Sequence, residues 1–168
     1  APFDITAGSY ILMEMETGRV LAGRDIHERL AMASTTKIMT ALLTLEQPDL
    51  DEYFTVDSKA ILVEGSSMGL LPGDQVTLRG LAIGMLLHSG NDSAGAAAVK
   101  VGGTTEGFVA MMNERAAGMG LTDTHFATPS GLDADDHYSS AYDMAVLAKN
   151  ALANEDFLAI CSTAKTQI

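Results

Sequence analysis

Residues 33–43 read Ala-Ser-Thr-Thr-Lys-Ile-Met-Thr-Ala-Leu-Leu, and the interpretation of the whole chain depends on this stretch. The pattern predicts a helix from Ser34 to about Gln47, which Pro48 ends because proline cannot continue a helix. Apolar residues lie on nearly all sides of this helix, which favours a position in the middle of the fold. A row of small polar side chains follows one face at helical spacing: Thr36, Thr40 and Thr44.

Ser34 and Lys37 are three positions apart, so on a helix they lie on the same face, one turn from each other. A serine hydroxyl is a weak nucleophile until a base removes its proton, and lysine can act as that base when its amine is neutral. The pair therefore predicts a serine nucleophile with a lysine base. An ordinary helix start with a solvent-facing lysine gives the same spacing. Ser162 and Lys165 repeat it, but in a strand-like segment that sends them to opposite faces.

Upstream of this helix the chain predicts a β-hairpin. Residues 9–15 form an apolar strand pattern, residues 16–19 a turn, and residues 20–23 a short return strand.

Downstream of the central helix the pattern is mostly helical. Cap residues, apolar spacing and glycine stops predict helices near residues 81–87, 92–100, 105–119, 140–151 and 154–160. Asp92 or Ser93 is the expected cap of the second of these, and Ser140 with Asp143 resembles a capping box. Short strands are expected at residues 54–56, at 75–78 and from residue 162 onward, and a loop at 121–139. The fold class is therefore α/β (α+β), a hairpin with a mostly helical body.

Ser89-Gly90-Asn91 interrupts two apolar helical segments. Buried polar residues at such a junction are costly unless they are hydrogen-bonded, so these residues either cap the following helix or line a cleft. Both interpretations remain open from the residues alone.

Gly65-Ser66-Ser67-Met68-Gly69 matches the G-x-S-x-G nucleophile elbow, which would make Ser67 the nucleophile of an esterase. An elbow places its serine between a strand and a helix. Here Pro72 and Gly73 impose a turn where that helix should begin. Ser67 is therefore interpreted as a loop residue, with the esterase as an alternative function.

Composition excludes several classes of function. The 168 residues hold 10 Lys plus Arg against 22 Asp plus Glu, a net charge of −12 that argues against nucleic acid or an anionic membrane as partner. Cys161 is the only cysteine, and the histidines lack metal-binding spacing, so neither a metal nor another cofactor is expected. No apolar run reaches 18 residues, so we expect no membrane anchor in this chain.

Residues 33–43 and the segment His-Ser-Gly-Asn-Asp-Ser-Ala at 88–94 together resemble the active-site serine enzymes of the penicillin-binding group. The closest resemblance is to the D-alanyl-D-alanine carboxypeptidases, the low-molecular-mass penicillin-binding proteins. Further similarity lies in residues 18–21, 65–68, 72–74, 131–132 and 137–141, so it spans essentially the whole chain. The resemblance implies a penicillin-binding protein/β-lactamase-like fold.

By this resemblance Ser34 is the acylated nucleophile, Lys37 its base, and Ser89 the relay that carries a proton to the leaving D-alanine. Asn91 would hold Lys37 and the substrate amide, with Gly90 and Ser67 beside the substrate. Gly90 replaces the aspartate of the β-lactamase S-D-N triplet, which favours the carboxypeptidase branch. The implied partners are peptidoglycan pentapeptides ending in D-Ala-D-Ala and β-lactam antibiotics, and the implied location is extracytoplasmic.

One family motif is missing. The K-T-G triplet of a strand that borders the cleft has no counterpart, since Lys165-Thr166-Gln167 repeats only its first two residues. We therefore expect residues 1–168 to be the N-terminal portion of one catalytic domain, whose remaining strands come from a second polypeptide fragment or were lost. Because the strands that the resemblance implies beside the hairpin are missing, we expect the hairpin to have an unpaired, apolar edge that invites pairing with a second polypeptide or a neighbouring copy. A non-catalytic scaffold that binds wall peptides is the alternative.

Overall fold

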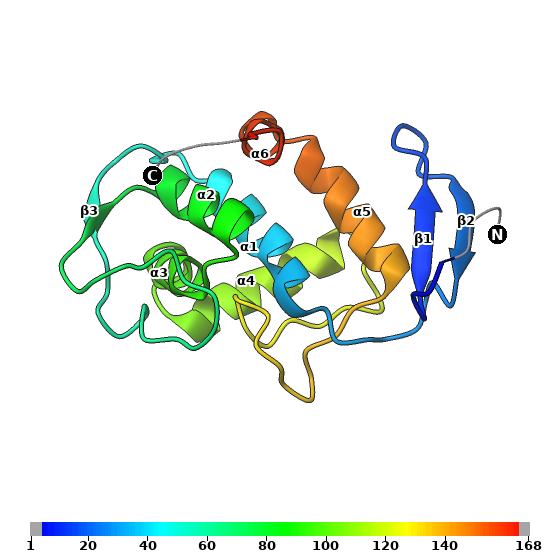
Figure 1. Ribbon diagram of the computed structural model, residues 1–168, viewed down its shortest axis with the longest axis horizontal. Coiled ribbons are helices and arrows are strands. Elements are labelled where there is room, and N and C mark those ends of the chain that lie inside the picture. Colours follow the sequence, from blue (N-terminus) through cyan, green and yellow to red (C-terminus); the bar gives the residue numbers. More distant parts are fainter. Residues whose placement is uncertain (1–4, 165–168) are drawn as a thin grey trace.

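The computed structural model describes residues 5–164, and its first element is the expected hairpin. Strand β1 (Tyr10–Met13) pairs antiparallel with β2 (Val20–Arg24), with Tyr10 opposite Arg24. The Glu14 carboxylate closes the turn by accepting the backbone N–H groups of Glu16 and Thr17, both at 2.8 Å. The hairpin lies at one end of the molecule, beyond the helices (Figure 1).

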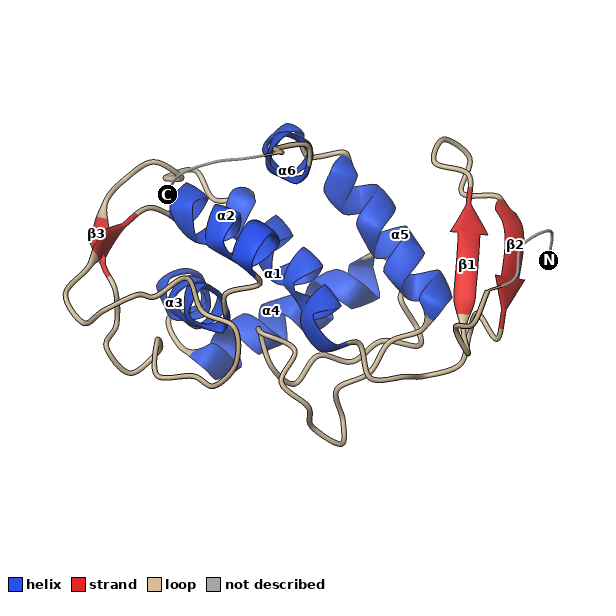
Figure 2. Ribbon diagram, in the orientation of Figure 1, coloured by secondary structure: helices blue, strands red, loops and turns tan. Residues whose placement is uncertain are grey.

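Six α-helices and a second small sheet make up the rest of the described chain (Figure 2). Their bounds are α1 (Lys37–Leu45), β3 (Phe54–Thr55), β4 (Gln75–Val76), α2 (Leu78–His88), α3 (Asn91–Gly102), α4 (Thr105–Gly118), α5 (Ala141–Leu152) and α6 (Glu155–Cys161). Strand β3 pairs antiparallel with β4. Among residues 5–164 neither sheet gains a third strand, so the hairpin has the expected unpaired edges, while β1 contacts α5.

Helix α1 is the centre of the helical body, as predicted. All of its residues except Ile38 are buried, and it contacts α2, α3, α4, α5 and α6. One turn of 3-10 helix, η1 (Ala33–Thr36), precedes it, so the predicted helix does begin near Ser34 but in a tighter form. The row of threonines is fully buried, and two of its members face the loop at residues 121–139: Thr36 and Thr40.

That loop returns to the beginning of the helical body. Leu30 and Ser139 exchange backbone hydrogen bonds of 2.8 and 3.0 Å, and His125 pairs with Tyr138 in the same way. The loop therefore runs beside η1 and the start of α1, although about a hundred residues separate them in the sequence.

The helix starts show which capping predictions hold. Ser140 accepts the N–H of Asp143 as expected, while the Asp143 carboxylate instead accepts the N–H of Asp123. The prediction that Asp92 or Ser93 caps α3 is wrong. The N-cap is Gly90, because the Asp92 carboxylate is used by a neighbouring loop.

Two strand predictions need correction. The strand expected at 75–78 stops at Val76, because Thr77 caps α2 by accepting the N–H of Gly80. The strand expected from residue 162 is not found over 162–164, and its remainder, with Lys165-Thr166-Gln167, lies outside the described residues.

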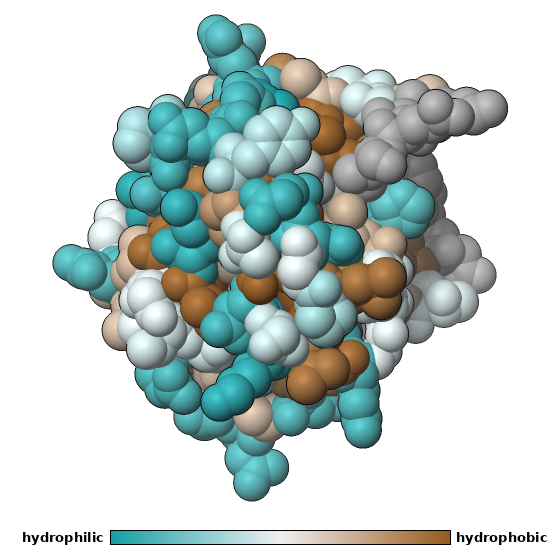
Figure 3. All heavy atoms as spheres, turned by 90° about the vertical axis from the view of Figure 1, so that its left-hand side faces the viewer, coloured by the Kyte–Doolittle hydropathy of each residue, from teal (hydrophilic) through white to brown (hydrophobic). Residues whose placement is uncertain are grey.

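Within residues 5–164 no helix is both long and apolar enough to cross a bilayer. Figure 3 shows that apolar patches on the end with β3 and α3 are interrupted by polar side chains.

Candidate active site

Ser34 and Lys37 meet as the helical spacing predicts. The Lys37 Nζ lies 3.2 Å from the Ser34 Oγ and 2.6 Å from the backbone carbonyl oxygen of Ser130. Ser34 is exposed, whereas Lys37 is only 2% exposed. An exposed serine is therefore in contact with a buried amine. The interpretation of Lys37 as a solvent-facing helix residue is wrong.

Burial lowers the pKa of Lys37 from its ordinary value of 10.5 to about 8. In the part of the chain that the structure describes, no carboxylate forms an ion pair with this amine, so no opposite charge offsets the loss of water. The amine therefore loses its proton much closer to neutral pH than an ordinary lysine does. A lysine in this state can accept the proton of a nearby hydroxyl.

Strained backbone directly precedes the pair and also occurs at Ser89. Among the described residues only Asp25, Ala33 and Ser89 are non-glycine residues with positive φ, at 47°, 45° and 55°. Ala33 directly precedes Ser34, and Ser89 is itself a candidate catalytic residue. Such conformations are unfavourable for L-residues and concentrate at functional sites, where the surrounding structure holds them.

The segment 129–131 packs directly on η1 and α1. Thr40 Oγ1 donates to the Pro129 carbonyl at 2.6 Å, one residue before the Ser130 carbonyl that accepts from Lys37. Gly131 has φ of 90°, and a Cβ atom there would lie 1.9 Å from the Ala33 carbonyl oxygen. Glycine at 131 is therefore required both by its backbone conformation and by the closeness of Ala33.

We expect Gly131→Ala to destabilise the chain by more than about 2 kcal/mol, since an unfavourable φ alone costs about 1 to 2 kcal/mol. Gly73→Ala is the matched control, because Gly73 has φ of 94° and no atom within 4 Å of the added Cβ. Urea unfolding of both variants separates the cost of the conformation from the cost of the contact. Equal losses of stability would show that the contact with Ala33 has no energetic weight.

Ser89, Gly90 and Asn91 form the junction between α2 and α3. The Asn91 N–H donates to the Ser66 carbonyl at 2.7 Å, and its Nδ2 donates to the Glu64 carbonyl at 2.5 Å. The expectation that Asn91 holds the Lys37 amine needs correction, because no hydrogen bond joins them in the described chain. Among the described residues that amine hydrogen-bonds to Ser34 and Ser130, because Ser130 supplies the acceptor and Glu64 holds the Asn91 amide.

The buried Asp92 carboxylate organises the loop that contains Ser67. It accepts the Ser67 hydroxyl at 2.6 Å and three backbone N–H groups at 3.0 Å, those of Met68, Gly69 and Leu70. Burial by itself raises the pKa of Asp92, but the hydrogen bonds from Ser67 and the backbone outweigh it and hold the pKa below its ordinary value. A Cβ at Gly90 would lie 2.9 Å from Asp92 Oδ1, so glycine at 90 makes room for this carboxylate.

The same contacts argue against the nucleophile elbow. Residues 65–69 form a loop that no helix directly follows, and the Ser67 hydroxyl donates to the Asp92 carboxylate, whereas an elbow serine donates to a histidine. Ser67 therefore has a structural hydrogen bond, and a contact between Ser67 and substrate stays a prediction.

Three residues that were not predicted as site residues contribute to the site. Ser130 supplies the carbonyl that holds Lys37, Asp92 holds the 67–70 loop, and His137 bonds to Thr36. The sequence signals were the Gly131-Leu132 pair, the polar junction at 88–94 and the His137–Ala141 segment. None of these patterns specifies a partner so distant in the sequence.

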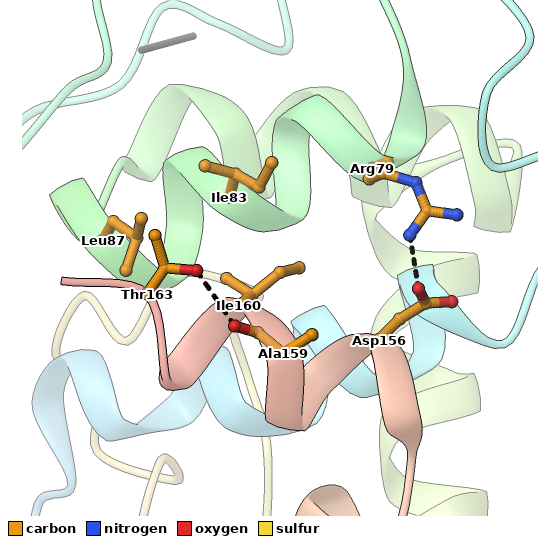
Figure 4. Close-up of a pocket in the computed structure, with 7 residues that line it drawn as sticks. All are labelled: Arg79, Ile83, Leu87, Asp156, Ala159, Ile160 and Thr163. Atoms are coloured by element: carbon orange, nitrogen blue, oxygen red, sulfur yellow. Dashed lines mark hydrogen bonds and ion pairs between the residues drawn. The ribbon is translucent and has the colours of Figure 1, made fainter. Parts of the chain in front are cut away.

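A separate pocket lies between α2 and α6 (Figure 4). Its wall contains Ile83, Leu87 and Ile160, and the Arg79–Asp156 ion pair of 2.5 Å lies at one end. Ser34, Lys37 and Ser89 are not among its lining residues. The candidate site is therefore identified by its chemistry rather than by this hollow.

Known proteins share both the sequence and the fold. The chain is 40% identical over 162 residues to the D-alanyl-D-alanine carboxypeptidase DacF of Bacillus subtilis, covering 94% of this chain and 42% of that protein. It is 40% identical over 159 residues to DacB2 of Mycobacterium tuberculosis, covering 94% of this chain and 54% of that protein. The chain thus spans about half or less of the length of these relatives.

Two solved structures are similar to this fold. The crystal structure of a D-alanyl-D-alanine carboxypeptidase from Mycobacterium tuberculosis H37Rv gives a TM-score of 0.92 at 38% identity, covering 97% of this chain and 62% of that one. A variant of the Streptomyces K15 DD-transpeptidase gives a TM-score of 0.89 at 32% identity, covering 94% of this chain and 65% of that one. The expected penicillin-binding-protein-like fold is confirmed by these neighbours. The sequence pattern described as D-alanyl-D-alanine carboxypeptidase (Peptidase_S11) matches residues 1–167, and this chain therefore belongs to that family.

Proposed function

We propose that this chain provides the nucleophile and base of a serine-type D-Ala-D-Ala carboxypeptidase that acts on peptidoglycan stem peptides. The observation that supports this most is the buried Lys37 amine, 3.2 Å from the exposed Ser34 hydroxyl and without a carboxylate partner in the described chain. The substrate chemistry comes from the family. Because peptidoglycan is the proposed substrate, we also propose an extracytoplasmic location.

In the proposed reaction, neutral Lys37 removes the Ser34 proton while the Ser34 Oγ attacks the carbonyl carbon between the two D-alanines. The C–N bond then breaks, and the leaving amine of the terminal D-alanine takes up, through the Ser89 hydroxyl, the proton that Lys37 accepted from Ser34. Water hydrolyses the ester at Ser34 and restores the enzyme. The Ser34 N–H belongs to the first turn of a helix, where N–H groups lack helical partners, so it is suited to stabilise the oxyanion.

The terminal carboxylate of the substrate needs a cationic or hydrogen-bonding partner. The chain has a net charge of −12, and Lys37 is already assigned to proton transfer. We propose that a K-T-G strand supplies this partner, whether from a longer form of the same polypeptide or from a second fragment. We also propose that Asn91 and Ser67 contact the substrate. Asn91 donates to the Glu64 carbonyl and Ser67 to the Asp92 carboxylate, so both side chains are held in place.

A fluorescent penicillin tests the proposal. We expect covalent labelling of Ser34 in a chimera in which the remaining length of Bacillus subtilis DacF follows residue 168, with residues 1–168 alone assayed in parallel. Peptide mass mapping locates the adduct. Ser34→Ala should abolish the label, while Ser67→Ala should retain it.

The two alternatives give different outcomes. Labelling that survives Ser34→Ala, or an organophosphate adduct on Ser67, would reject Ser34 as nucleophile. A folded chimera that binds wall peptides reversibly, with equal affinity after Ser34→Ala and without any adduct, would identify a non-catalytic binding protein.

A further inference from the structure

His137 is a buried histidine whose two ring nitrogens both have partners. It is 3% exposed; its Nδ1 accepts the backbone N–H of Ala127 at 2.9 Å, and its Nε2 lies 2.7 Å from Thr36 Oγ1. Since Nδ1 accepts a hydrogen bond, the hydrogen-bond network assigns the ring proton to Nε2, which donates to Thr36. Both contacts together require the neutral ring.

The two contacts connect the catalytic helix to the loop that holds its lysine. Thr36 lies between Ser34 and Lys37, and Ala127 lies three residues before the Ser130 carbonyl that accepts from Lys37 Nζ at 2.6 Å. Thr40 holds the Pro129 carbonyl from the next turn of α1. The His137 ring therefore fixes Ala127, at the start of the segment 127–131, and Ser130 of the same segment holds the Lys37 amine.

We propose that His137 is a positioning residue, which holds residues 127–131 against η1 so that the Ser130 carbonyl places the Lys37 amine beside Ser34, and which releases that segment when its ring is protonated. A protonated ring has N–H at both nitrogens, so it can no longer accept from Ala127. The inference rests on the proposed function, because only that function makes Lys37 a catalytic base. The contacts of His137 are independent of it.

Burial and the charges around the ring set the pH at which this release occurs. Burial is the largest influence and lowers the pKa of His137, Asp133 and Asp136 raise it, and His125 lowers it. On the side of η1 and α1 the charged residue next to Thr36 is Lys37. The net effect is a pKa below the ordinary 6.5, so the neutral ring and the intact contact are present at neutral pH.

The test measures the pKa of Lys37 by an NMR titration of residues 1–168, which needs no catalytic turnover. In the wild type we expect a value of about 8. In His137→Phe the segment should loosen and admit water, so the value should rise by about one unit or more toward 10.5. His27→Gln, at an exposed histidine, is the control and should leave it unchanged.

Two further variants keep the test decisive if His137→Phe does not fold. Thr36→Val removes only the Nε2 partner at nearly constant volume and should also raise the pKa of Lys37. His137→Asn preserves an acceptor for Ala127, should restore the wild-type value, and should abolish the acid-induced change in the Ala127 amide shift seen in the wild type. A folded His137→Phe or Thr36→Val protein with an unchanged Lys37 pKa would overturn the proposal, whereas absence of a penicillin adduct would overturn only the proposed function.

Discussion

Lys37→Met is expected to slow the acylation of Ser34 by a factor of about 10² to 10⁴, the range that a positioned general base contributes. Methionine keeps the apolar stem of lysine but has no group that can accept the Ser34 proton. The rate of penicillin adduct formation in the chimera described above measures this loss. In the wild type that rate should increase with pH up to about 8, as the Lys37 amine becomes neutral, and then level off.

The same substitution is expected to stabilise the fold. Because the folded-state pKa of about 8 is below the unfolded value of 10.5, the unfolded chain binds more protons between these values and wild-type stability increases with pH across that window. Below pH 8 the buried charge therefore costs about 3 kcal/mol. The Ser130 carbonyl loses its donor in the variant, at about 1 to 2 kcal/mol, so a net gain of about 1 to 2 kcal/mol remains at pH 7.

Lys59→Met is the matched control for both effects, because Lys59 is exposed and lies away from Ser34 in the sequence. We expect it to change neither the acylation rate nor the urea unfolding midpoint. Undiminished acylation in Lys37→Met would remove lysine from the proposed mechanism. A large loss of stability would instead mean that the charged amine supports the fold.

Asp92→Asn is expected to destabilise the fold by about 2 to 4 kcal/mol, because hydrogen bonds to a charged acceptor are lost and buried donors are left without a partner. The Asp92 carboxylate accepts from the Ser67 hydroxyl and from the backbone N–H groups of Met68, Gly69, Leu70 and Ser93. In asparagine an NH₂ group replaces one of the two carboxylate oxygens. An NH₂ group cannot accept a hydrogen bond, so the donors that face it lose their partner. Urea unfolding at pH 7 measures the cost.

The pH dependence distinguishes this carboxylate from a surface one. The pKa of Asp92 is lowered in the folded chain, so its contribution is present above the unfolded value near 3.8 and is lost as the pH falls through the folded value. In Asp92→Asn that acid-sensitive part of stability should be missing. Asp57→Asn is the control, since Asp57 also accepts two backbone N–H groups but is exposed, and its effect should be much smaller. Equal effects of the two variants would show that burial does not increase the contribution of Asp92 to the free energy of unfolding.

Local patterns predicted the hairpin, the central helix and the contact between Ser34 and Lys37, because each depends on residues close together in the sequence. The partner of Lys37 could not be predicted in this way. Ser130 is 93 positions from Lys37 and acts through its backbone carbonyl, which any residue type possesses. The sequence signal at that place was Gly131, whose requirement is evident only when the Ala33 carbonyl lies beside it.

Asp92 illustrates the opposite error. A carboxylate near a helix start is a common cap, and the local pattern predicted that role. The carboxylate instead accepts from residues 22 to 25 positions earlier, which no helical or strand periodicity connects to it. Local propensity identified the correct helix and assigned its acidic residue to the wrong partner.

The distance in sequence between Thr36 and His137, 101 positions, has a consequence for the newly made polypeptide. Ribosomes add about 5 to 20 residues per second, so roughly 5 to 20 seconds pass between synthesis of the two residues. During that interval the nascent lysine is hydrated and fully charged, and the neighbouring hydroxyl is no more reactive than any other serine. Under the proposed mechanism, nucleophilic reactivity of Ser34 therefore arises only after the segment that contains residue 137 has been translated and has folded back.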